Sequence, residues 1–415
     1  MTVVRGGSVV TGGAVVDADV VVVDGRIAAV TGPGGADPGA EPVIDAGGLL
    51  VMPGMVDAHV HFQEPGREAW EGFDTGSAAA AAGGVTTVVD MPIDCDPPTV
   101  TAAAVRAKAD AVRRHSRVDV AVWGGLTPRS VGDLEAMAAA GVVGFKAFAC
   151  PSGWDEFPPV DRQALAAGAT VAARRGLPVA VHCELAELGH SVESEVEAVR
   201  WAAAVVTGCG ARLHVVHASA AAAVDESRRW PRTTVETCPH YLFLEEGERL
   251  GPAARCSPPI RDAANRAALW ERVTAGVVDW IASDHSPCPP GRREGPHPWA
   301  GIDGVGMALP LLLGSTRLDP PAVARLTTAA ARHLGLAGKG AITPGFDADL
   351  VLVDPATAWT VDPALGLTRH RSSPYGGITV RGRVEMTLVR GSVVYSRAEG
   401  PGPAGGGRFV RPGAS

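Results

Sequence analysis

Short β-branched runs separated by turn residues occupy both ends of the chain. Asp24-Gly25 stands between two such runs near the N-terminus, and Arg390-Gly391 stands between two more near the C-terminus. An Asp-Gly pair between apolar runs is a typical hairpin signal. We therefore expect residues 1–52 and 344–415 to form one small β-sandwich domain. The glycine- and proline-rich tail from Gly400 is expected to be loosely held.

The middle of the chain, residues 53–343, alternates continuous apolar runs with alanine-rich stretches. The apolar runs are typical of buried strands, and alanine favours helices. The alternation predicts βα units around a parallel sheet, and about 36 residues per unit is the size expected in a (β/α)8 barrel. The expected fold class is α/β, a TIM-like barrel with a small β-sandwich domain built from both termini. The clearest runs are 85–89, 118–122, 142–145, 178–181, 212–216 and 277–281.

Composition and charge narrow the class of protein. The formal net charge of −8 disfavours nucleic acid and anionic membrane surfaces as partners. With 46% hydrophobic and 20% charged residues, the chain has the composition of a globular protein with a large core. It has neither an apolar stretch long enough to span a membrane nor a recognisable signal peptide, so a cytoplasmic location is expected. Seven cysteines without a CxxC pair indicate reduced thiols.

Two histidines two residues apart follow the Pro53-Gly54 turn, at positions 59 and 61. This spacing places the imidazoles of His59 and His61 on one face of a strand. Two neutral imidazoles on one face are a good partial site for a transition metal. Such a pair alone is a weak signal, because it also arises by coincidence.

Four further polar residues follow apolar runs, at steps of about one or two βα units of about 36 residues, except the first step from His61, which corresponds to three units only if some are short. They are Lys146, His182, His217 and Asp284. Together with the histidine pair they fall at the ends of predicted strands 1, 4, 5, 6 and 8. Catalytic groups of a (β/α)8 barrel gather at this carboxyl-terminal rim. The register therefore strengthens the prediction of a metal site.

A lysine at the end of an apolar strand requires an explanation, because a buried unpaired ammonium is costly. Lys146 could be salt-bridged, or its ammonium could reach solvent at the end of a buried stem. Alternatively its amine has reacted with CO2, and the resulting carbamate bridges two cations. We favour the carbamate, with a half-site for one cation on each side. The half-sites are His59 and His61 with Asp284, and His182 with His217.

Three other histidines lie near these positions in the sequence. His214 should point to the opposite face of its strand from His217, which predicts a structural role. His240 is expected at the end of the seventh strand, where contact with substrate and a structural role are both open. His285 should point away from the side on which Asp284 lies.

The strings around these residues resemble the cyclic amidohydrolase group, which contains allantoinases, dihydroorotases and hydantoinases. The shared strings are DAHVH at 57–61, GFK at 144–146, VH at 181–182, VHAS at 216–219 and SDHSP at 283–287. Narrower strings are similar to allantoinases and extend the resemblance over nearly the whole chain. These are EPGREAWEGF at 64–73, CSPPIRD at 256–262, SPCPP at 286–290 and SPY at 373–375.

The resemblance implies a metal-dependent hydrolase with a barrel, a β-sandwich and two divalent metal ions. Zinc is the usual metal, and iron, manganese or cobalt serve some members. The resemblance also implies that N6-carboxylated Lys146 bridges the two ions held by the half-sites named above. Ser257 matches the serine whose backbone holds the ring amide in hydantoinases. The expected partners are a small cyclic amide and further copies of the chain, in a dimer or tetramer.

Two positions depart from the pattern of allantoinases, and the segment between His182 and His217 is shorter than usual. Asp94 stands where allantoinases usually carry Asn, and Gly306 stands where many carry Gln. Both are expected to contact substrate at the pocket rim and to weaken binding of allantoin. Gln63 replaces the arginine that would meet the carboxylate of dihydroorotate, which disfavours a dihydroorotase.

The function expected from these observations is hydrolysis of a ring amide, with allantoin converted to allantoate. A hydroxide held between the two cations attacks the ring carbonyl, and Asp284 carries the proton to the leaving nitrogen. The main alternative is a hydantoinase-like enzyme or a specialised hydrolase of cyclic ureides or lactams. A non-catalytic scaffold relative is disfavoured, because such proteins are expected to lack metal ligands and all six are present here.

Overall fold

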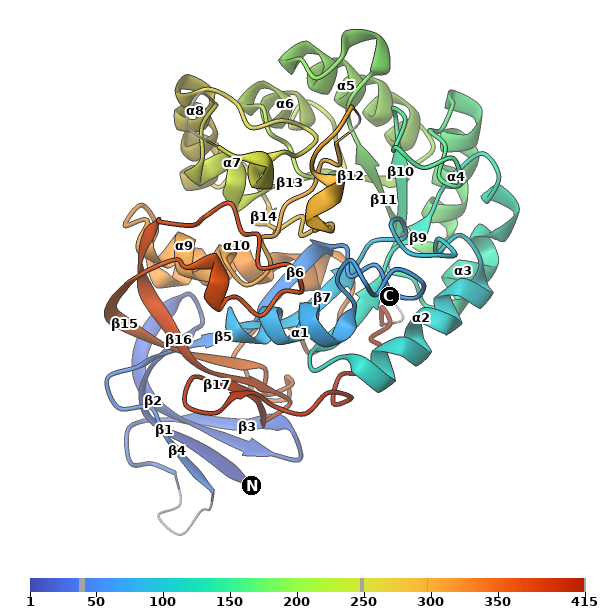
Figure 1. Ribbon diagram of the computed structural model, residues 1–415. Helices are drawn as coiled ribbons and strands as arrows, with labels where there is room; N and C mark the ends of the chain where they lie inside the picture. The colour runs from blue at the N-terminus through green and yellow to red at the C-terminus, as the bar shows by residue number, and fades with distance from the viewer. Residues whose placement is uncertain (37–41, 247–249, 297, 414–415) are drawn as a thin grey trace.

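Parallel strands of the middle segment close into a barrel in the computed structural model, which describes residues 1–36, 42–246, 250–296 and 298–413 (Figure 1). The barrel strands are β6 (Met55–Val60), β7 (Val85–Asp90), β8 (Asp119–Val122), β9 (Gly124–Gly125), β10 (Phe145–Phe148), β11 (Pro178–His182), β12 (Arg212–Val215), β13 (Thr233–Thr237) and β14 (Trp280–Ile281). Each of these strands except β8, which continues into β9, is followed by at least one helix, as the alternating pattern predicts.

Two hydrogen-bonded groups of strands make up the barrel wall. One has the order β6-β7-β8 and the other runs from β9 through β10, β11, β12 and β13 to β14. Only Trp123 separates β8 from β9, so these two segments form one bent barrel strand. A parallel bridge between Val60 and His285 closes the ring, and the backbone N–H of His61 donates to the carbonyl of His285 at 2.7 Å.

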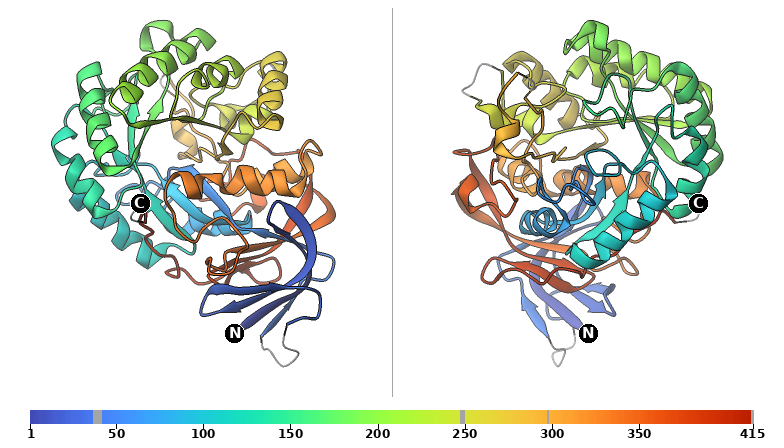
Figure 2. Two further views of the ribbon diagram at one scale, coloured as in Figure 1. Left: turned by 180° about the vertical axis from the view of Figure 1, so that it is seen from behind. Right: turned by 45° about the vertical axis from the view of Figure 1, so that its right-hand side comes forward.

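Helices form the outer layer of the barrel (Figures 1 and 2). Five of them begin at a serine, threonine or aspartate whose side chain accepts from a backbone N–H of the first turn. Short 3₁₀ turns lie at 131–133, 186–188, 252–254, 290–292 and 363–365. The α-helices are α1 (Phe73–Ala82), α2 (Ala102–His115), α3 (Leu134–Ala140), α4 (Arg162–Arg175), α5 (Val192–Gly208), α6 (Ala221–Ser227), α7 (Pro239–Phe243), α8 (Ala263–Thr274), α9 (Ala308–Gly314) and α10 (Pro320–His333).

Strands from both ends of the chain share a second sheet. Its order is β18-β17-β16-β15-β5-β1-β2-β3, with β4 beside β1. The N-terminal strands (blue) and C-terminal strands (red) lie together below the barrel in Figure 1. The strands are β1 (Thr2–Thr11), β2 (Ala14–Val23), β3 (Arg26–Thr31), β4 (Val43–Asp45), β5 (Leu50–Pro53), β15 (Leu350–Thr360), β16 (Thr379–Val389), β17 (Ser392–Ser396) and β18 (Gly400–Pro401).

Both predicted hairpins are present in this sheet. Asp24 and Gly25 join β2 to β3, and Arg390 and Gly391 join β16 to β17. All four residues have positive φ, between 48° and 78°, as a two-residue turn between twisted strands requires. The predicted fold class, a TIM-like barrel with a small β-sandwich built from both termini, is confirmed.

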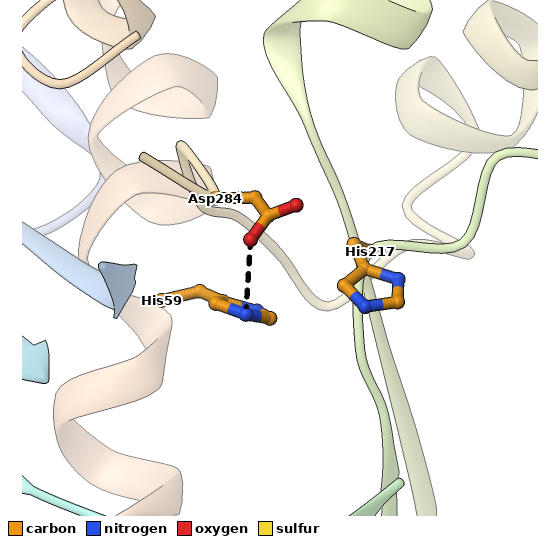
Figure 3. A group of neighbouring side chains, drawn as sticks. All are labelled: His59, His217 and Asp284. Atoms are coloured by element: carbon orange, nitrogen blue, oxygen red, sulfur yellow. Dashed lines mark ion pairs between the residues drawn. The ribbon is translucent and has the colours of Figure 1, made fainter. Parts of the chain in front are cut away.

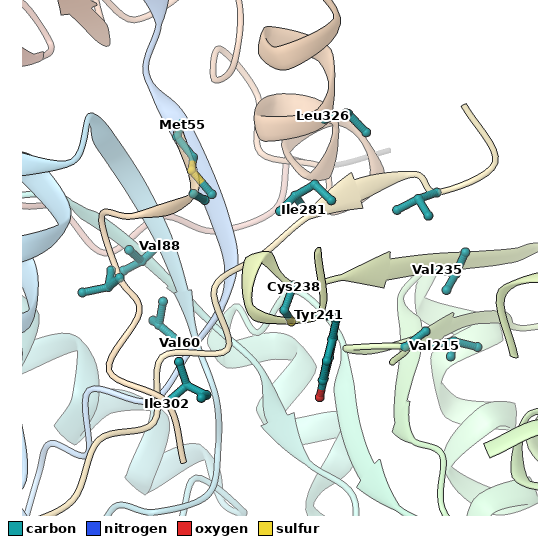
Figure 4. Packing of buried hydrophobic residues seen from close by; sticks show 14 of the residues in the cluster. Met55, Val60, Val88, Val215, Val235, Cys238, Tyr241, Ile281, Ile302 and Leu326 are labelled. Atoms are coloured by element: carbon teal, nitrogen blue, oxygen red, sulfur yellow. The ribbon is translucent and has the colours of Figure 1, made fainter. Parts of the chain in front are cut away.

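A large apolar core fills the barrel and continues beneath the helices. Figure 4 shows part of it, where Val88, Val215, Val235 and Ile281 come from four different barrel strands. The sheet of the two termini has a separate valine- and leucine-rich core. None of the helices in the described ranges is both long and apolar enough to cross a membrane.

The expectation of a loosely held tail from Gly400 is wrong. Gly400 and Pro401 pair with β17 as strand β18. Further on, the carbonyl of Arg408 accepts from Val120, and the N–H of Val410 donates to the carbonyl of the same residue. The tail is polar and glycine-rich, but its backbone groups bind the edge of β8, which composition does not reveal.

Candidate metal centre

A cavity of about 800 Å³ opens at the carboxyl ends of the barrel strands. Its wall brings together residues that lie more than 200 positions apart in the chain. All six predicted metal ligands line it, as do Asp94 and Ser257 from the predicted substrate contacts. The six are His59, His61, Lys146, His182, His217 and Asp284.

His59, His217 and Asp284 form the tightest group in this cavity (Figure 3). Each offers one ligand atom, and these atoms all lie within 4.8 Å of one another. His59 Nε2 is 3.1 Å from Asp284 Oδ1. His59 is the fifth residue of β6, whereas His217 and Asp284 lie just beyond the ends of β12 and β14. Imidazole nitrogen and carboxylate oxygen form a donor set that suits zinc and related transition metals.

The other two histidines extend this group on either side. His61 Nε2 lies 3.5 Å from the same oxygen of Asp284. His182 Nδ1 lies 2.9 Å from His217 Nε2, so these two ring nitrogens face each other. The rings of His59 and His217 are 5.2 Å apart between centroids. The geometry therefore joins the two predicted half-sites into one cluster of imidazoles around Asp284.

Carboxylates that the sequence reasoning missed lie behind three of the histidines. His59 Nδ1 is 2.6 Å from Glu236 Oε1. His182 Nε2 is 2.7 Å from Glu184 Oε2, and His61 Nδ1 is 2.7 Å from Asp94 Oδ2. A carboxylate on one ring nitrogen holds the proton there and leaves the other nitrogen free to bind a cation. This arrangement is typical of metal-binding histidines.

Glu236 is the most constrained of these carboxylates. It is fully buried in β13, and its Oε2 accepts from Trp280 Nε1 at 2.7 Å. Burial alone would raise its pKa, but His214 and His59 hold the pKa well below the ordinary value. A charged residue within a strand whose other residues are threonine and valine was the available signal for this role. The contact of Glu236 with His59 could not be predicted from the sequence, because the two residues lie 177 positions apart.

Lys146 lies in β10, next to β11, the strand that ends at His182. Its Nζ is completely buried and has no hydrogen-bond partner among the described residues. It lies 4.8 Å from the centre of the Phe148 ring. Burial lowers the pKa of Lys146 to about 8, although Asp284 and Glu236 raise it. The lowered pKa leaves part of the amine uncharged near neutral pH, and the uncharged form is the one that reacts with CO2.

Strained backbone concentrates at this end of the barrel. Gln63, Asp94, His217 and Asp284 all have positive φ, between 38° and 70°, although none is a glycine. Each such residue costs on the order of 1–3 kcal/mol and persists only where the surrounding structure imposes it. The backbone at two of the six candidate ligands is therefore fixed in an unfavourable conformation, which is typical of functional sites.

The charge state of Asp284 suits a proton acceptor. Burial alone would raise its pKa, but His59 and His61 lower the pKa to about 2. Ser257 lies nearby and donates its hydroxyl to Glu184 Oε2 at 2.8 Å. Its hydroxyl is therefore occupied, and the residue lines the same cavity.

His240 does not lie at the end of the seventh strand as predicted. That strand ends at Thr237, and His240 belongs to the short helix α7, where Pro239 begins a new helical turn. It is absent from the described lining of the cavity. Both ring nitrogens are buried without a hydrogen-bond partner in the described structure. Burial lowers the pKa of His240 to about 4, against the effect of Asp284.

Gly306 lies away from the candidate centre, contrary to the prediction that it lines the substrate pocket. It borders a second cavity, of about 450 Å³, between α1 and strands β15–β17. A Cβ at this position would come within 2.5 Å of the carbonyl oxygen of Ala79 in α1. Its φ of +80° also disfavours any side chain. Glycine occupies position 306 because the backbone here packs directly against the backbone of α1.

His214 and His285 have partners outside the cavity. His214 stacks on Trp280 with 4.3 Å between ring centroids, and its Nε2 is 3.1 Å from Glu236 Oε2. His214 therefore supports the carboxylate behind His59. The Nδ1 atom of His285 accepts from the backbone N–H groups of Gly304 and Val305 at 3.3 Å.

Fold and site together define a barrel hydrolase whose catalytic end carries a cluster of histidines and carboxylates. The Amidohydrolase family model matches residues 50–394, and the chain belongs to this family. The predicted class of enzyme is thereby confirmed. Family membership also implies a binuclear metal centre, for which this cluster provides candidate ligands.

Individual relatives and solved structures show which enzymes this chain is similar to. An allantoinase from Rubrobacter xylanophilus is 43% identical, with 99% of this chain and 97% of the relative covered. An allantoinase from Escherichia coli is 37% identical, with 98% of each chain covered. The structure of L-hydantoinase (dihydropyrimidinase) from Arthrobacter aurescens superposes with a TM-score of 0.93 at 30% identity and covers 99% of both chains. The predicted resemblance to the cyclic amidohydrolase group is confirmed.

Proposed function

We propose that this enzyme hydrolyses the ring amide of allantoin to give allantoate. The observation that carries the proposal is the convergence of four histidines, one lysine and one aspartate on a single cavity at the barrel rim. The relatives named allantoinase, at 37–43% identity over nearly the full chain, support allantoin as the substrate.

The donor set fits two divalent cations. His59, His61 and Asp284 would hold one, and His182 and His217 would hold the other. Lys146 would bridge them as an N6-carboxylate, which turns its buried partnerless amine into an anionic ligand. We propose zinc as the metal, since imidazole-rich sites suit zinc, with iron, manganese or cobalt as possible replacements. When bound, such cations lower the pKa of a water molecule and polarise a carbonyl group.

Residues of this chain carry out the remaining steps. Asp284 is ionised near neutral pH, so it can accept a proton from the attacking water. The same carboxylic acid then returns the proton to the ring nitrogen as the C–N bond breaks. The backbone of Ser257 orients the ring amide in the cavity, and the carboxylate of Asp94, in the wall of the same cavity, lies 2.7 Å from His61 Nδ1.

A hydantoinase-like activity is the second candidate, because the solved structures most similar in fold include hydantoinases. A panel of allantoin, hydantoin, dihydrouracil and dihydroorotate, assayed side by side with the zinc-loaded enzyme, separates the two. The highest kcat/KM is expected for allantoin. A preference for hydantoin or dihydrouracil would replace the proposed substrate and keep the reaction class. No hydrolysis of any ring by protein with two bound cations would contradict both.

Two further features belong to the proposal. The relatives are enzymes of small cyclic amides, and we propose that this chain acts on its substrate as a dimer or tetramer. Light scattering of the purified protein tests the assembly directly. We also propose that residues 1–52 and 344–415 form the sandwich domain and residues 53–343 form the catalytic barrel domain.

A further inference from the structure

Asp94 lies between a candidate metal ligand and the wall of the cavity. Its Oδ2 is 2.7 Å from His61 Nδ1, and its Oδ1 accepts from the indole Nε1 of Trp154 at 2.6 Å. The side chain is only 4% exposed, and the residue has a positive φ of 70°. The fold therefore holds this carboxylate in a strained position, with Oδ1 in a hydrogen bond from Trp154 and Oδ2 beside His61 Nδ1, a ring nitrogen without a hydrogen bond to any described residue.

Trp154 belongs to an aromatic cluster, of which Trp154 and Trp299 line the cavity. Its ring centroid lies 5.3 Å from that of Trp299 and 6.0 Å from that of Trp70. The guanidinium carbon of Arg67 lies 3.6 Å above the Trp154 ring. These residues come from the loops after β6, β10 and β14. Through Asp94, the aromatic wall formed by three loops is tied to His61.

An aspartate can satisfy this position, and an asparagine cannot. A carboxylate accepts from both neighbours, whereas an amide offers one acceptor oxygen and one donor NH2 group. If the amide oxygen faced His61, the NH2 group would meet the indole N–H of Trp154. If the amide turned over, its NH2 group would face His61 Nδ1 and favour the tautomer with the proton on Nε2. That tautomer has no lone pair on Nε2 for a cation.

We propose that Asp94 is a positioning residue that fixes the metal-binding tautomer of His61 with one carboxylate oxygen while its other oxygen accepts from Trp154. An aspartate is required here because Trp154 supplies a second N–H donor. Where that donor is absent, an asparagine serves equally well. This inference rests on the proposed metal centre and assigns Asp94 to the centre itself, not to recognition of substrate.

A double-mutant cycle on the apoprotein tests whether the need for a carboxylate at residue 94 depends on the indole donor of Trp154. The affinity for Co²⁺ is measured by competition with a chelator for wild type, Asp94→Asn, Trp154→Phe and the double variant. Asp94→Asn alone is expected to weaken binding of one of the two cations by about 10- to 100-fold. Trp154→Phe removes the competing donor and leaves the carboxylate on His61, so binding should change by less than about threefold. The double variant is expected to recover most of the loss, because the amide oxygen can then face His61.

Recovery in the double variant is the outcome that a general structural role would not produce. Asp96→Asn is the matched control, since it removes the same charge from an exposed position in the same loop. Urea midpoints of all variants show whether folding has changed. Asp94→Asn binding Co²⁺ as wild type does, or the double variant binding as weakly as Asp94→Asn, overturns the inference. Failure of wild type to bind two cations would instead overturn the proposed metal centre.

Discussion

Lys146 is the single residue whose environment is hardest to reconcile with an ordinary side chain. Its amine is buried without a hydrogen-bond partner in the described structure, although a buried ammonium costs several kcal/mol. The proposed carboxylation would remove this cost and would supply a bridging anion. Lys146→Ala is therefore expected to lose nearly all activity and at least one bound cation per chain. Short carboxylic acids such as acetate should restore part of the turnover.

The control for Lys146 is Lys146→Arg, which keeps the positive charge but cannot form the carbamate. It should be inactive and should not respond to added acid. Metal content by elemental analysis and turnover of the proposed substrate are the two measurements. Wild-type turnover in Lys146→Ala without added acid would exclude a bridging role.

Asp284 carries the proton transfer in the proposed reaction. Asp284→Asn keeps the shape of the side chain but removes the basic oxygen, so kcat should fall by about a hundredfold or more. The fall should persist after the variant is saturated with zinc, which separates the loss of the base from the loss of a ligand. A kcat within a few-fold of wild type at full metal occupancy would assign the proton transfer to another group.

The sequence predicted the histidines and Asp284 at residue scale because they end strands at regular intervals. It did not predict the carboxylates behind them. Glu236 contacts His59, which lies 177 positions away in the sequence, whereas Glu184 contacts His182, which lies only two positions away. Neither separation has a characteristic pattern, since the contact depends on how side chains turn at the barrel rim. Gly306 lies outside this cavity for a different reason, because its backbone packs against that of α1.

At the scale of elements, α1 packs against the segment that follows β14 through two glycines. A Cβ on Gly83 would lie 2.0 Å from the Cα of Gly306, so no side chain fits. Gly83→Ala is expected to destabilise the fold by about 1–3 kcal/mol, the usual range for overpacking. Gly208→Ala, at the end of α5 with open space around it, is the control and should be neutral or slightly stabilising.

Urea denaturation measures both glycine variants. The two midpoints should differ, with Gly83→Ala the lower. Equal midpoints would show that α1 can shift away from residue 306 without loss.

Helices and strands could be told apart from the sequence where the spacing of hydrophobic residues and the type of turn residues indicated the same structure. The hairpins at Asp24-Gly25 and Arg390-Gly391 needed only local sequence. Strand bounds were less accurate, since the run predicted at 142–145 becomes the strand Phe145–Phe148. An apolar run continues into a buried loop without any change in composition. Only the hydrogen bonds to neighbouring strands decide where the strand begins.

At the scale of the whole molecule, a buried charge cluster joins the barrel to the sheet of the two termini. Lys339 Nζ lies 2.6 Å from Asp119 of β8, 2.7 Å from Asp349 and 3.0 Å from Asp347. Arg390, at the turn between β16 and β17, also contacts Asp119. The N–H of Arg408 in the C-terminal tail donates to the same carboxylate. The alternating pattern predicted the two domains, but a contact among such distant segments left no local signal.

Lys339→Met should therefore weaken the link between barrel and sheet, because it leaves buried carboxylates without their cation. Breaking a buried pair in this way costs about 3–5 kcal/mol. Urea denaturation gives the loss, and Arg174→Met, which breaks an exposed ion pair with Glu135, is the control expected to show no measurable change. A loss as small as that of the control would mean that water or a counter-ion replaces the ammonium.

The loss of unfolding free energy caused by Lys339→Met should also depend on pH. Burial raises the pKa of Asp349 to about 6 from an ordinary 3.8, although Lys339 opposes the rise. The folded protein binds this proton more tightly than the unfolded chain, so ionisation of Asp349 destabilises the fold as pH rises through 6. Removing Lys339 moves the folded pKa still higher, and the protonated acid needs no cation. The difference in unfolding free energy between wild type and Lys339→Met should therefore be smaller at pH 5 than at pH 8. A difference that is constant, or that grows as pH falls, would show that Asp349 is not the carboxylate that Lys339 stabilises.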